Sequence, residues 1–391
     1  MIPPRKRRVA LLGSTGSIGT TTLNVARAMP DRIEIVALAA GNNIEKLATQ
    51  ARETGVRHVA IHDAYQEKAL RALLPDGVKI HTGPDGLVEV ATLAEADIVL
   101  VSIVGTAGLF PALAAINAGK DLAIASKEIL VMAGEVITRA AEEKGVQLLP
   151  VDSEHNAIFQ CLNGQHARNA EVSRLILTAS GGPFRQLPAN ELAKVTPEQA
   201  LCHPTWNMGP KITIDSATLF NKGLEMIEAR WLFGIGMDRI DVVVHPQSII
   251  HSMVEFVDGS VLAQLSLTDM GFPIQYALTW PDRIKGTLAP LDFPSLAKLE
   301  FEAPRTDDFP ALDLARKAGL TGGTLPAVYN AANEVAVDAF RAGKIPFPGI
   351  WQCVASVMQN HEVQASSSLE AVVTADQWAR HAASKFCEAM G

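Results

Sequence analysis

The sequence predicts an α/β protein with a doubly wound parallel sheet in its N-terminal part, a second sheet in its middle and a small helical domain at its end. Three observations predict this class. Apolar segments alternate with helical segments over residues 9–150, a glycine-rich loop joins the first strand to the first helix, and helical periodicity resumes after a proline-rich stretch at residues 281–310. Strands that alternate with helices are typical of parallel sheets covered by helices on both faces.

The composition is that of an ordinary globular protein with two or three cores. The chain has 391 residues, of which 48% are hydrophobic and 19% charged, and its net charge of −8 argues against broad binding of nucleic acid. The 4 cysteines are widely spaced, which favours free thiols in a reduced cytoplasmic setting. No apolar run reaches the roughly 18 residues of a membrane span, and the early first strand predicts that there is no targeting peptide.

The first predicted strand, residues 9–12, runs directly into GSTGSIG, with glycines at positions 13, 16 and 19, and then into a helix at 20–29. This context favours a dinucleotide loop, because small residues let the backbone approach a pyrophosphate at a helix N-terminus. A tight turn without a ligand is the alternative. The second strand, residues 33–38, ends in AAGNN, without the acid that NAD enzymes use for the ribose hydroxyl. Its absence favours NADP, although no Arg or Lys stands there either.

Further strands at residues 56–61, 97–104, 121–125 and 144–150 should end at the same edge of the sheet as the glycine loop. Two polar segments, Ser126–Glu128 and Asp152–Glu154, come directly after the last two of these strands. Two neighbouring carboxylates repel each other unless a cation is present, and oxygen ligands favour Mg²⁺ or Mn²⁺. An N-cap aspartate followed by a first-turn glutamate is the alternative.

The stretch from His203 to Arg230 carries the densest set of candidate side chains. Its ITI segment, residues 212–214, predicts a strand, followed by a helix start at Asp215 and Ser216. On that helix an amide, an ammonium and a carboxylate share an arc of roughly 100°; they are Asn221, Lys222 and Glu225. This combination suits a phosphorylated ligand beside a metal ion. A solvated surface with a Lys–Glu pair is the alternative.

Two loops complete the candidate site. A strand at residues 173–178 leads into ASGGP, where Ser180 and two glycines predict an anion-binding nest or a plain turn. Residues 201–210 form a loop with a histidine and a tryptophan, which predicts either a lid or a surface loop held by one buried Trp. Strands are expected at 239–244 and 260–266. His245 and His251 between them have no zinc-type spacing and are predicted either to be structural or to hold the residues that contact a ligand.

Several motifs together resemble the 1-deoxy-D-xylulose 5-phosphate reductoisomerase family. They are GSTGSIG, SKE, VDSEHNAIFQ, ASGGPF, HPTWNMG, DSATLFNKGLE, VHPQSIIHSMVEF and NAANEVAV, and they span nearly the whole chain. The resemblance implies conversion of 1-deoxy-D-xylulose 5-phosphate to 2-C-methyl-D-erythritol 4-phosphate in the non-mevalonate isoprenoid pathway, with NADPH and a divalent cation such as Mn²⁺, Mg²⁺ or Co²⁺.

The resemblance also implies an organisation and an assembly. Residues 1–150 would bind NADPH, and residues 151–285 would form an α+β catalytic and metal-binding domain with a lid near 200–210. Residues 286–310 would link this domain to the helical domain at 311–391. The chain would act on its small phosphorylated sugar as a homodimer, without nucleic acid or membrane.

The family's functional residues can be carried onto matching positions. The metal ligands would be Asp152, Glu154 and Glu225. The phosphate would be held by Ser180, Ser216, Asn221 and Lys222. Lys127, Ser153, Glu154 and His203 would contact the reacting substrate, with Lys127, Glu154 and His203 catalytic, and Trp206 and Met208 would belong to the lid. The NADPH site would comprise Gly13, Thr15, Gly16, Ser17, Ile18, Gly41, Asn42, Asn43, Ser126, Glu128 and Gly209. Asn42 and Ser126 differ from some family members, which bears on NADPH affinity.

Two other functions keep part of this pattern. An NADP-dependent dehydrogenase of a small phosphorylated substrate would need the glycine loop but not three carboxylates. A nucleotide-sensing regulator without catalysis would need neither the carboxylates nor Lys222. Product analysis distinguishes the first, since simple reduction keeps an unbranched skeleton, and loss of activity without metal distinguishes the second.

Overall fold

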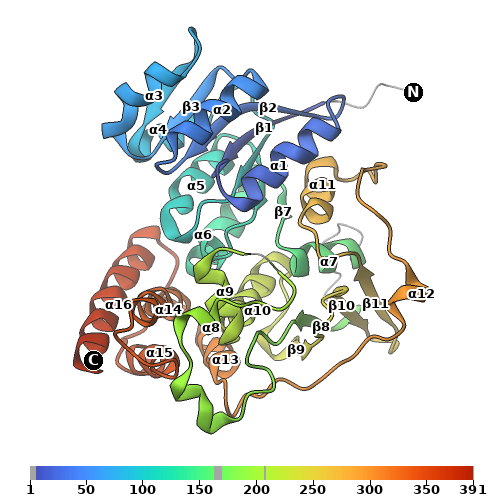
Figure 1. The fold of residues 1–391 in the computed structure, drawn as a ribbon, viewed down its shortest axis with the longest axis vertical. Coiled ribbons are helices and arrows are strands. Elements are labelled where there is room, and N and C mark those ends of the chain that lie inside the picture. Colours follow the sequence, from blue (N-terminus) through green and yellow to red (C-terminus); the bar gives the residue numbers. More distant parts are fainter. Residues whose placement is uncertain (1–5, 163–169, 207, 391) are drawn as a thin grey trace. The chain divides into compact units, whose positions relative to one another are not determined.

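The computed structural model describes residues 6–162, 170–206 and 208–390, which fold into two compact units (Figure 1). The first unit comprises Met1–Ile129, Ile137–Asn156 and Asp269–Ala289. The second comprises Leu130–Val136, Ala157–Thr268 and Pro290–Gly391. Each unit therefore combines segments that are far apart in the sequence.

Among its described residues, the first unit contains a seven-stranded sheet in which every neighbouring pair of strands is parallel. The strands are β1 (Arg7–Leu12), β2 (Ile33–Ala40), β3 (His58–Ile61), β4 (Lys79–Thr82), β5 (Ile98–Val101), β6 (Asp121–Ile124) and β7 (Leu148–Pro150). Their spatial order is β4-β3-β2-β1-β5-β6-β7. The order reverses between β1 and β5, and in doubly wound sheets that point is where ligands bind, beyond the carboxyl ends of the strands.

The central strands of this sheet are largely apolar, as expected where helices cover both faces. The last four residues of β1 are fully buried, and so is all of β5. The covering and connecting helices are α1 (Ser17–Ala28), α2 (Ile44–Thr54), η1 (Ala64–Gln66), α3 (Glu67–Leu73), α4 (Gly83–Ala91), η2 (Gly105–Gly108), α5 (Leu109–Asn117) and α11 (Gly271–Thr279). Two helices have residues in both units: α6 (Glu128–Lys144) and α7 (Ser153–Cys161).

The second unit contains a mixed four-stranded sheet, again counted over its described residues. Its strands are β8 (Val172–Ala179), β9 (Ile240–Val244), β10 (Ile250–Phe256) and β11 (Val261–Leu265), in the order β11-β10-β8-β9. β8 and β9 are parallel, whereas β10 is antiparallel to both of its neighbours. β11 therefore forms one edge of this sheet.

The remaining helices of the second unit build its core. They are η3 (Ala189–Lys194), α8 (Pro197–Ala200), α9 (Pro210–Ala217), α10 (Phe220–Phe233), η4 (Met237–Arg239), α12 (Phe293–Leu296), α13 (Ala311–Thr321), α14 (Leu325–Arg341), α15 (Gly349–Gln359) and α16 (Leu369–Met390). α14 packs against α13, α15 and α16, and also contacts α9 and α10. Burial of its Tyr329 and Phe340 explains its central place.

The expected α/β class and the closing helices are confirmed, but the strand predicted at residues 212–214 is wrong. That segment lies inside α9, which begins with Pro210 directly after Gly209. Proline is well tolerated at the first helical position, because its missing N–H would have no partner there. Asp215 and Ser216 consequently lie near the end of α9, not at the start of the next helix.

Other boundaries also moved. β4 and β10 were not expected, and the strand predicted to begin at residue 144 begins at Leu148, because Lys144 still belongs to α6. The predicted connector at 281–310 contains the short helix α12. In the part of the chain that the structure describes, no helix is both long and apolar enough to cross a membrane.

Candidate functional site

The glycine loop lies at the switch point of the first unit's sheet, between β1 and β5. Gly13 has φ +94°, and a Cβ there would lie 2.6 Å from the carbonyl oxygen of Ser102, just past β5. A Cβ on Gly19 would lie 2.3 Å from the carbonyl oxygen of Gly13. Only glycine fits at these two positions, and α1 begins at Ser17 with its N-terminus at this loop.

The side chain of Lys46 lies beside this loop, which the sequence did not predict. Lys46, in the first turn of α2, donates from its Nζ to the carbonyl oxygen of Thr15 at 2.8 Å. Asn43 caps the same helix by accepting from the backbone N–H of Lys46 at 3.1 Å. No basic residue stands at the end of β2 itself, and only the turn of α2 brings Lys46 back to the loop. A lysine three residues after a capping asparagine was the signal for it.

Two further residues predicted at the nucleotide site, Ser126 and Glu128, follow β6 and are buried. Ser126 donates from its hydroxyl to the carbonyl oxygen of Ile103 at 2.5 Å, which ties the end of β6 to the segment after β5. Gly41 and Asn42, by contrast, are exposed beyond β2. The predicted nucleotide residues of the first unit thus lie beyond the carboxyl ends of β1, β2 and β6.

The carboxylates after β7 are held in place by hydrogen bonds and an ion pair. Asp152 takes the N-cap position of α7, because its carbonyl accepts from the N–H of Asn156 at 2.8 Å. Its carboxylate lies 2.5 Å from Nζ of Lys127, which is buried. Glu154, in the first turn of the same helix, accepts from the hydroxyl of Ser153 at 2.5 Å. Asp152 and Glu154 therefore do occupy the N-cap and the first turn of a helix, as the alternative interpretation expected. Both carboxylates lie on this one turn.

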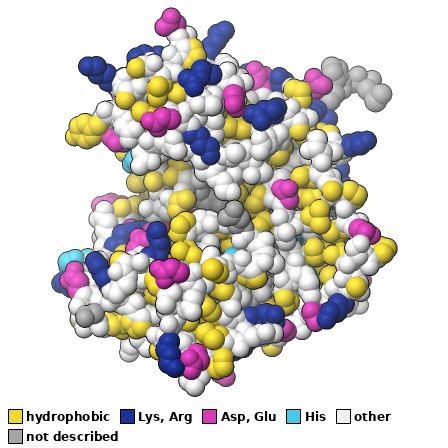
Figure 2. All heavy atoms as spheres, in the orientation of Figure 1, with side chains coloured by type: hydrophobic (Ala, Val, Ile, Leu, Met, Phe, Trp, Pro, Cys, Tyr) yellow, Lys and Arg dark blue, Asp and Glu magenta, His cyan; other side chains and the backbone are white. Residues whose placement is uncertain are grey.

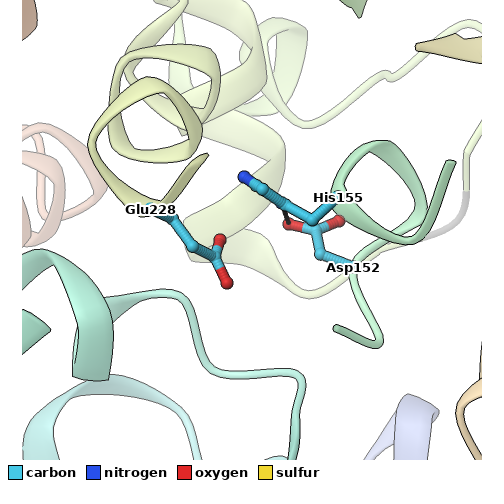
Figure 3. Close-up of side chains that lie close together, drawn as sticks. All are labelled: Asp152, His155 and Glu228. Atoms are coloured by element: carbon cyan, nitrogen blue, oxygen red, sulfur yellow. Dashed lines mark ion pairs between the residues drawn. The ribbon is translucent and has the colours of Figure 1, made fainter. Parts of the chain in front are cut away.

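Sequence reasoning missed two further titratable residues. His155, one turn after Asp152, is fully buried, and its Nδ1 lies 3.9 Å from Oδ2 of Asp152 (Figure 3). Glu228, also fully buried, is on α10 one turn after Glu225. The signals that could have found them were the i, i+3 spacing from Asp152 and the second acidic residue on an otherwise apolar helix.

The three polar residues predicted on one face of α10 do meet. Asn221 donates from its amide to Oε1 of Glu225 at 2.6 Å, and Lys222 makes a hydrogen-bonded ion pair with Oε2 of the same carboxylate. Lys222 and Glu225 are 3% and 0% exposed, so the alternative of a solvated surface pair is wrong. Burying a charged pair is costly unless both partners are bound, as they are here.

Ser180, His203 and Ser216 form a small polar cluster in the second unit. Nε2 of His203 lies 2.9 Å from the hydroxyl of Ser180 and 3.1 Å from that of Ser216, and the two hydroxyls are 3.5 Å apart. The other ring nitrogen, Nδ1, accepts from the backbone N–H groups of Thr205 and Trp206 at 3.2 and 2.9 Å. His203 is therefore the neutral Nε2–H tautomer, and burial lowers its pKa.

The remaining predicted residues lie on or beside the loop before α9. Trp206 and Met208 are half-buried, Gly209 caps α9, and the Trp206 ring lies 6.2 Å from that of His251. His245 is structural, as expected, because its Nδ1 donates to the carbonyl oxygen of Glu300 at 2.8 Å and its Nε2 accepts from the N–H of Ile249 at 3.2 Å.

The fold and these side chains define a class: a dinucleotide-dependent oxidoreductase with a polar cluster of Ser180, His203 and Ser216 and two neighbouring carboxylates after β7. Three family profiles match the chain: 1-deoxy-D-xylulose 5-phosphate reductoisomerase at residues 9–134, and two C-terminal domains of the same enzyme at residues 148–233 and 265–382. The chain belongs to the 1-deoxy-D-xylulose 5-phosphate reductoisomerase family.

Known relatives agree in sequence and in structure. A reductoisomerase of Symbiobacterium thermophilum is 55% identical over 97% of this chain and 98% of its own. The structure of the Zymomonas mobilis reductoisomerase in complex with NADPH superposes with a TM-score of 0.92 at 46% identity, covering 98% of this chain and 100% of that chain. A reductoisomerase structure in complex with NADPH, fosmidomycin and magnesium superposes with a TM-score of 0.91 at 39% identity, and the match covers 98% of each chain.

Proposed function

We propose that this chain converts 1-deoxy-D-xylulose 5-phosphate to 2-C-methyl-D-erythritol 4-phosphate, using NADPH and a divalent metal ion, in the non-mevalonate route to isoprenoids. The observation that carries the proposal is full-length membership of the reductoisomerase family together with a polar cluster of Ser180, His203 and Ser216 suited to a phosphate.

The metal ligands are proposed to be Asp152, Glu154 and Glu225. The first two lie on one turn after β7, where Nζ of Lys127 forms an ion pair of 2.5 Å with the carboxylate of Asp152. Glu225 is fully buried on α10. A donor set made only of carboxylate oxygens fits Mg²⁺ or Mn²⁺ rather than Zn²⁺. When bound, such an ion polarises the oxygens on either side of the carbon–carbon bond that breaks.

NADPH is proposed to bind over the glycine loop after β1. The space that a Cβ would fill at Gly13 and Gly19 is closed by backbone, so the loop keeps a shape in which its N–H groups can meet a pyrophosphate. Lys46, held at the carbonyl of Thr15, supplies positive charge next to this loop and favours a 2′-phosphate. The nicotinamide supplies the hydride that reduces the rearranged aldehyde.

The chain's own groups position the substrate. Ser180, Ser216, Asn221 and Lys222 are proposed to hold the phosphate, whose binding energy can be used for orientation because it does not react. His203 donates from Nε2 between the two serine hydroxyls and holds the following loop through Nδ1. Loop closure by Trp206 and Met208 would then exclude water from the hydride step. Lys127 and Ser153 are proposed to contact the hydroxyl and carbonyl groups of the substrate.

A homodimer is proposed to form through the β11 edge of the second sheet. β11 exposes Val261 and Leu262 at 47% and 49%, and Val257, just after β10, and Phe293, in α12, are 68% and 64% exposed. Hydrophobic side chains gather around α12 and β11 at the right of the view in Figure 2. An open apolar strand edge favours pairing with another chain. Light scattering should give the mass of two chains for the parent and of one chain for Leu262→Glu. We also propose a cytoplasmic location, in keeping with the wide spacing of the 4 cysteines in the sequence.

The decisive experiment is NADPH oxidation with 1-deoxy-D-xylulose 5-phosphate, with and without Mn²⁺, followed by product analysis. The proposal expects metal-dependent oxidation and a branched product. An unbranched reduced product would identify a simple dehydrogenase, and no oxidation under any metal would contradict catalysis.

A further inference from the structure

The NAANEVAV segment of α14 has no role in the site described above, yet it carries a buried amide with an unusual environment. Asn333 is fully buried, and its Nδ2 donates to Oδ1 of Asp215 at 2.8 Å. Its own Oδ1 is also buried and has no hydrogen-bond partner among the described residues. An unsatisfied buried carbonyl costs free energy and calls for an explanation. Rotating the amide would place oxygen against carboxylate, so the donor orientation towards Asp215 is fixed.

Asp215 is the other end of this contact and is itself buried, at 1% exposure. Nζ of Lys211, one turn earlier on α9, lies 2.7 Å from its Oδ2. The pKa of Tyr329 on α14 is raised, first by burial and then by the charge of Asp215. A carboxylate in such a place is expensive unless both of its oxygens are bound. Here Lys211 binds one and Asn333 the other, so the last turn of α9 is fixed to α14.

The residue after Asp215 is Ser216, whose hydroxyl lies 3.1 Å from Nε2 of His203. The backbone on its other side is tightly packed. A Cβ on Gly182, which has φ +67°, would lie 2.8 Å from the carbonyl oxygen of Ser216 and 2.9 Å from Cα of Ala217. The ASGGP loop and the end of α9 therefore touch through backbone, with no side chain between them to absorb a shift. Displacement of Asp215 is passed directly to Ser216 and to its spacing from Ser180.

We propose that Asn333 is a positioning residue: through Asp215 it holds Ser216 at the place required for the phosphate group of the substrate. This rests on the proposed function, because it assigns Ser216 to the phosphate. It gives the C-terminal helices an indirect part in substrate binding, through Asp215 and Ser216. Burying Asp215 and the unsatisfied oxygen of Asn333 costs free energy. An apolar contact would avoid that cost, but it has no direction and would let the end of α9 slide along α14.

The test compares Asn333→Ala with Val337→Ala, measured on the full chain with Mn²⁺ and NADPH. Val337 is on the same helix one turn later and fully buried, and it has no polar group with which to hold Asp215. Asn333→Ala should raise KM for the phosphorylated substrate and the dissociation constant of inorganic phosphate by about tenfold each, because small misplacements of binding groups are costly. Its kcat should change by less than about threefold, and its metal requirement should stay the same. Val337→Ala should lower Tm and leave KM and phosphate affinity unchanged.

A second variant protects the test if Asn333→Ala does not fold. Asp215→Asn keeps an oxygen that can accept from Asn333 but loses the pairing with Lys211. It should weaken phosphate binding by about threefold, less than Asp215→Ala does. Unchanged phosphate affinity in folded Asn333→Ala overturns the inference, and so does unchanged phosphate affinity in Asp215→Ala, which removes the acceptor of Asn333, when the first variant is unfolded. So does an equal rise in KM in Asn333→Ala and Val337→Ala, since general destabilisation would then explain both.

Inorganic phosphate separates this inference from the proposed function. If the parent binds phosphate but does not turn over the sugar phosphate, the proposed function fails, and phosphate affinity in the variants still decides the role of Asn333. If turnover is normal and Asn333→Ala binds phosphate as the parent does, only the positioning role fails. A parent that binds no phosphate overturns the inference outright.

Discussion

At the scale of single residues, burial separates two interpretations that spacing leaves open. Lys222 and Glu225 are three residues apart, a spacing found on countless solvated helices. In the structure both are almost fully buried and bound to each other, with Asn221 on the second carboxylate oxygen. A buried carboxylate with two donors already aimed at it has a defined orientation, which is what a metal ligand needs.

Glu225→Gln should therefore separate metal from phosphate. The change removes an anionic ligand and keeps the shape, so it should raise the Mn²⁺ concentration needed for half-maximal activity and lower kcat by roughly 100-fold or more. Circular dichroism should show an intact fold. Normal turnover at the parent's metal concentration would mean that Glu225 is only a buried structural charge.

Lys222→Ala should act on phosphate and not weaken metal binding. Without its cation, KM for the phosphorylated substrate should rise by about tenfold or more. Because Lys222 is ion-paired with Glu225, its loss leaves that carboxylate more available, so metal affinity should stay equal or increase. Metal titrations of both variants, run in parallel, measure this; weaker metal binding in Lys222→Ala would contradict the separation of roles.

Asn42→Asp should worsen the use of NADPH. Asn42 is exposed just beyond β2, where the chain has no acid. A carboxylate there would place like charge beside a 2′-phosphate, and kcat/KM for NADPH should fall by about tenfold while that for NADH changes little. Steady-state rates with both cofactors give the result. Equal kcat/KM for NADPH and NADH in the parent would refute the preference itself.

At the scale of elements, α9 bears on the proposal that the loop before it acts as a lid. The helix begins at Pro210 and ends at the residue after Ser216, so it connects the loop of Trp206 directly to the polar cluster. His203 holds the loop by accepting two backbone N–H groups at its Nδ1. A ligand that engages Nε2 of His203 can therefore bias the loop.

Trp206 should report this coupling. We expect its fluorescence to change when inorganic phosphate binds with Mn²⁺, because its half-buried ring would gain or lose packing as the loop moves. The change should be present in the parent and absent in Trp206→Phe, which serves as the control for the 4 other tryptophans. Trp206→Ala should reduce kcat/KM more than it reduces Tm, and a signal that persists without Trp206 would argue against a lid.

At the scale of the whole molecule, partly buried histidines make stability depend on pH. The pKa values of His58, His203 and His361 are lowered, in each case chiefly by burial. The unfolded chain, with histidine pKa values near about 6.5, takes up protons before the folded chain does. Their contribution to stability is therefore complete above about pH 6.5 and is lost as the pH falls through the lower folded values.

Melting temperatures between about pH 8 and pH 5 should accordingly fall towards acid, in the range where histidine titrates. Replacing each of the three histidines with Gln should flatten the curve, since Gln does not titrate, while His245→Gln provides a comparison at a histidine bound by two backbone groups. A profile as steep in the triple variant as in the parent would assign the acid sensitivity to other groups.

The sequence by itself determined the class of fold, because alternating apolar strands and helices around a glycine loop leave few other arrangements. The close backbone contacts at Gly13 and Gly19 explain why glycine is required there. It also determined which side chains to examine, through motifs placed after strands. It could not determine the helical state of residues 210–217, since three β-branched or apolar residues in a row predict a strand until tertiary contacts favour the helix. Nor could it find Lys46 beside Thr15 or Asn333 beside Asp215, because hydrogen bonds that span 31 and 118 residues depend on how helices pack and leave no local pattern.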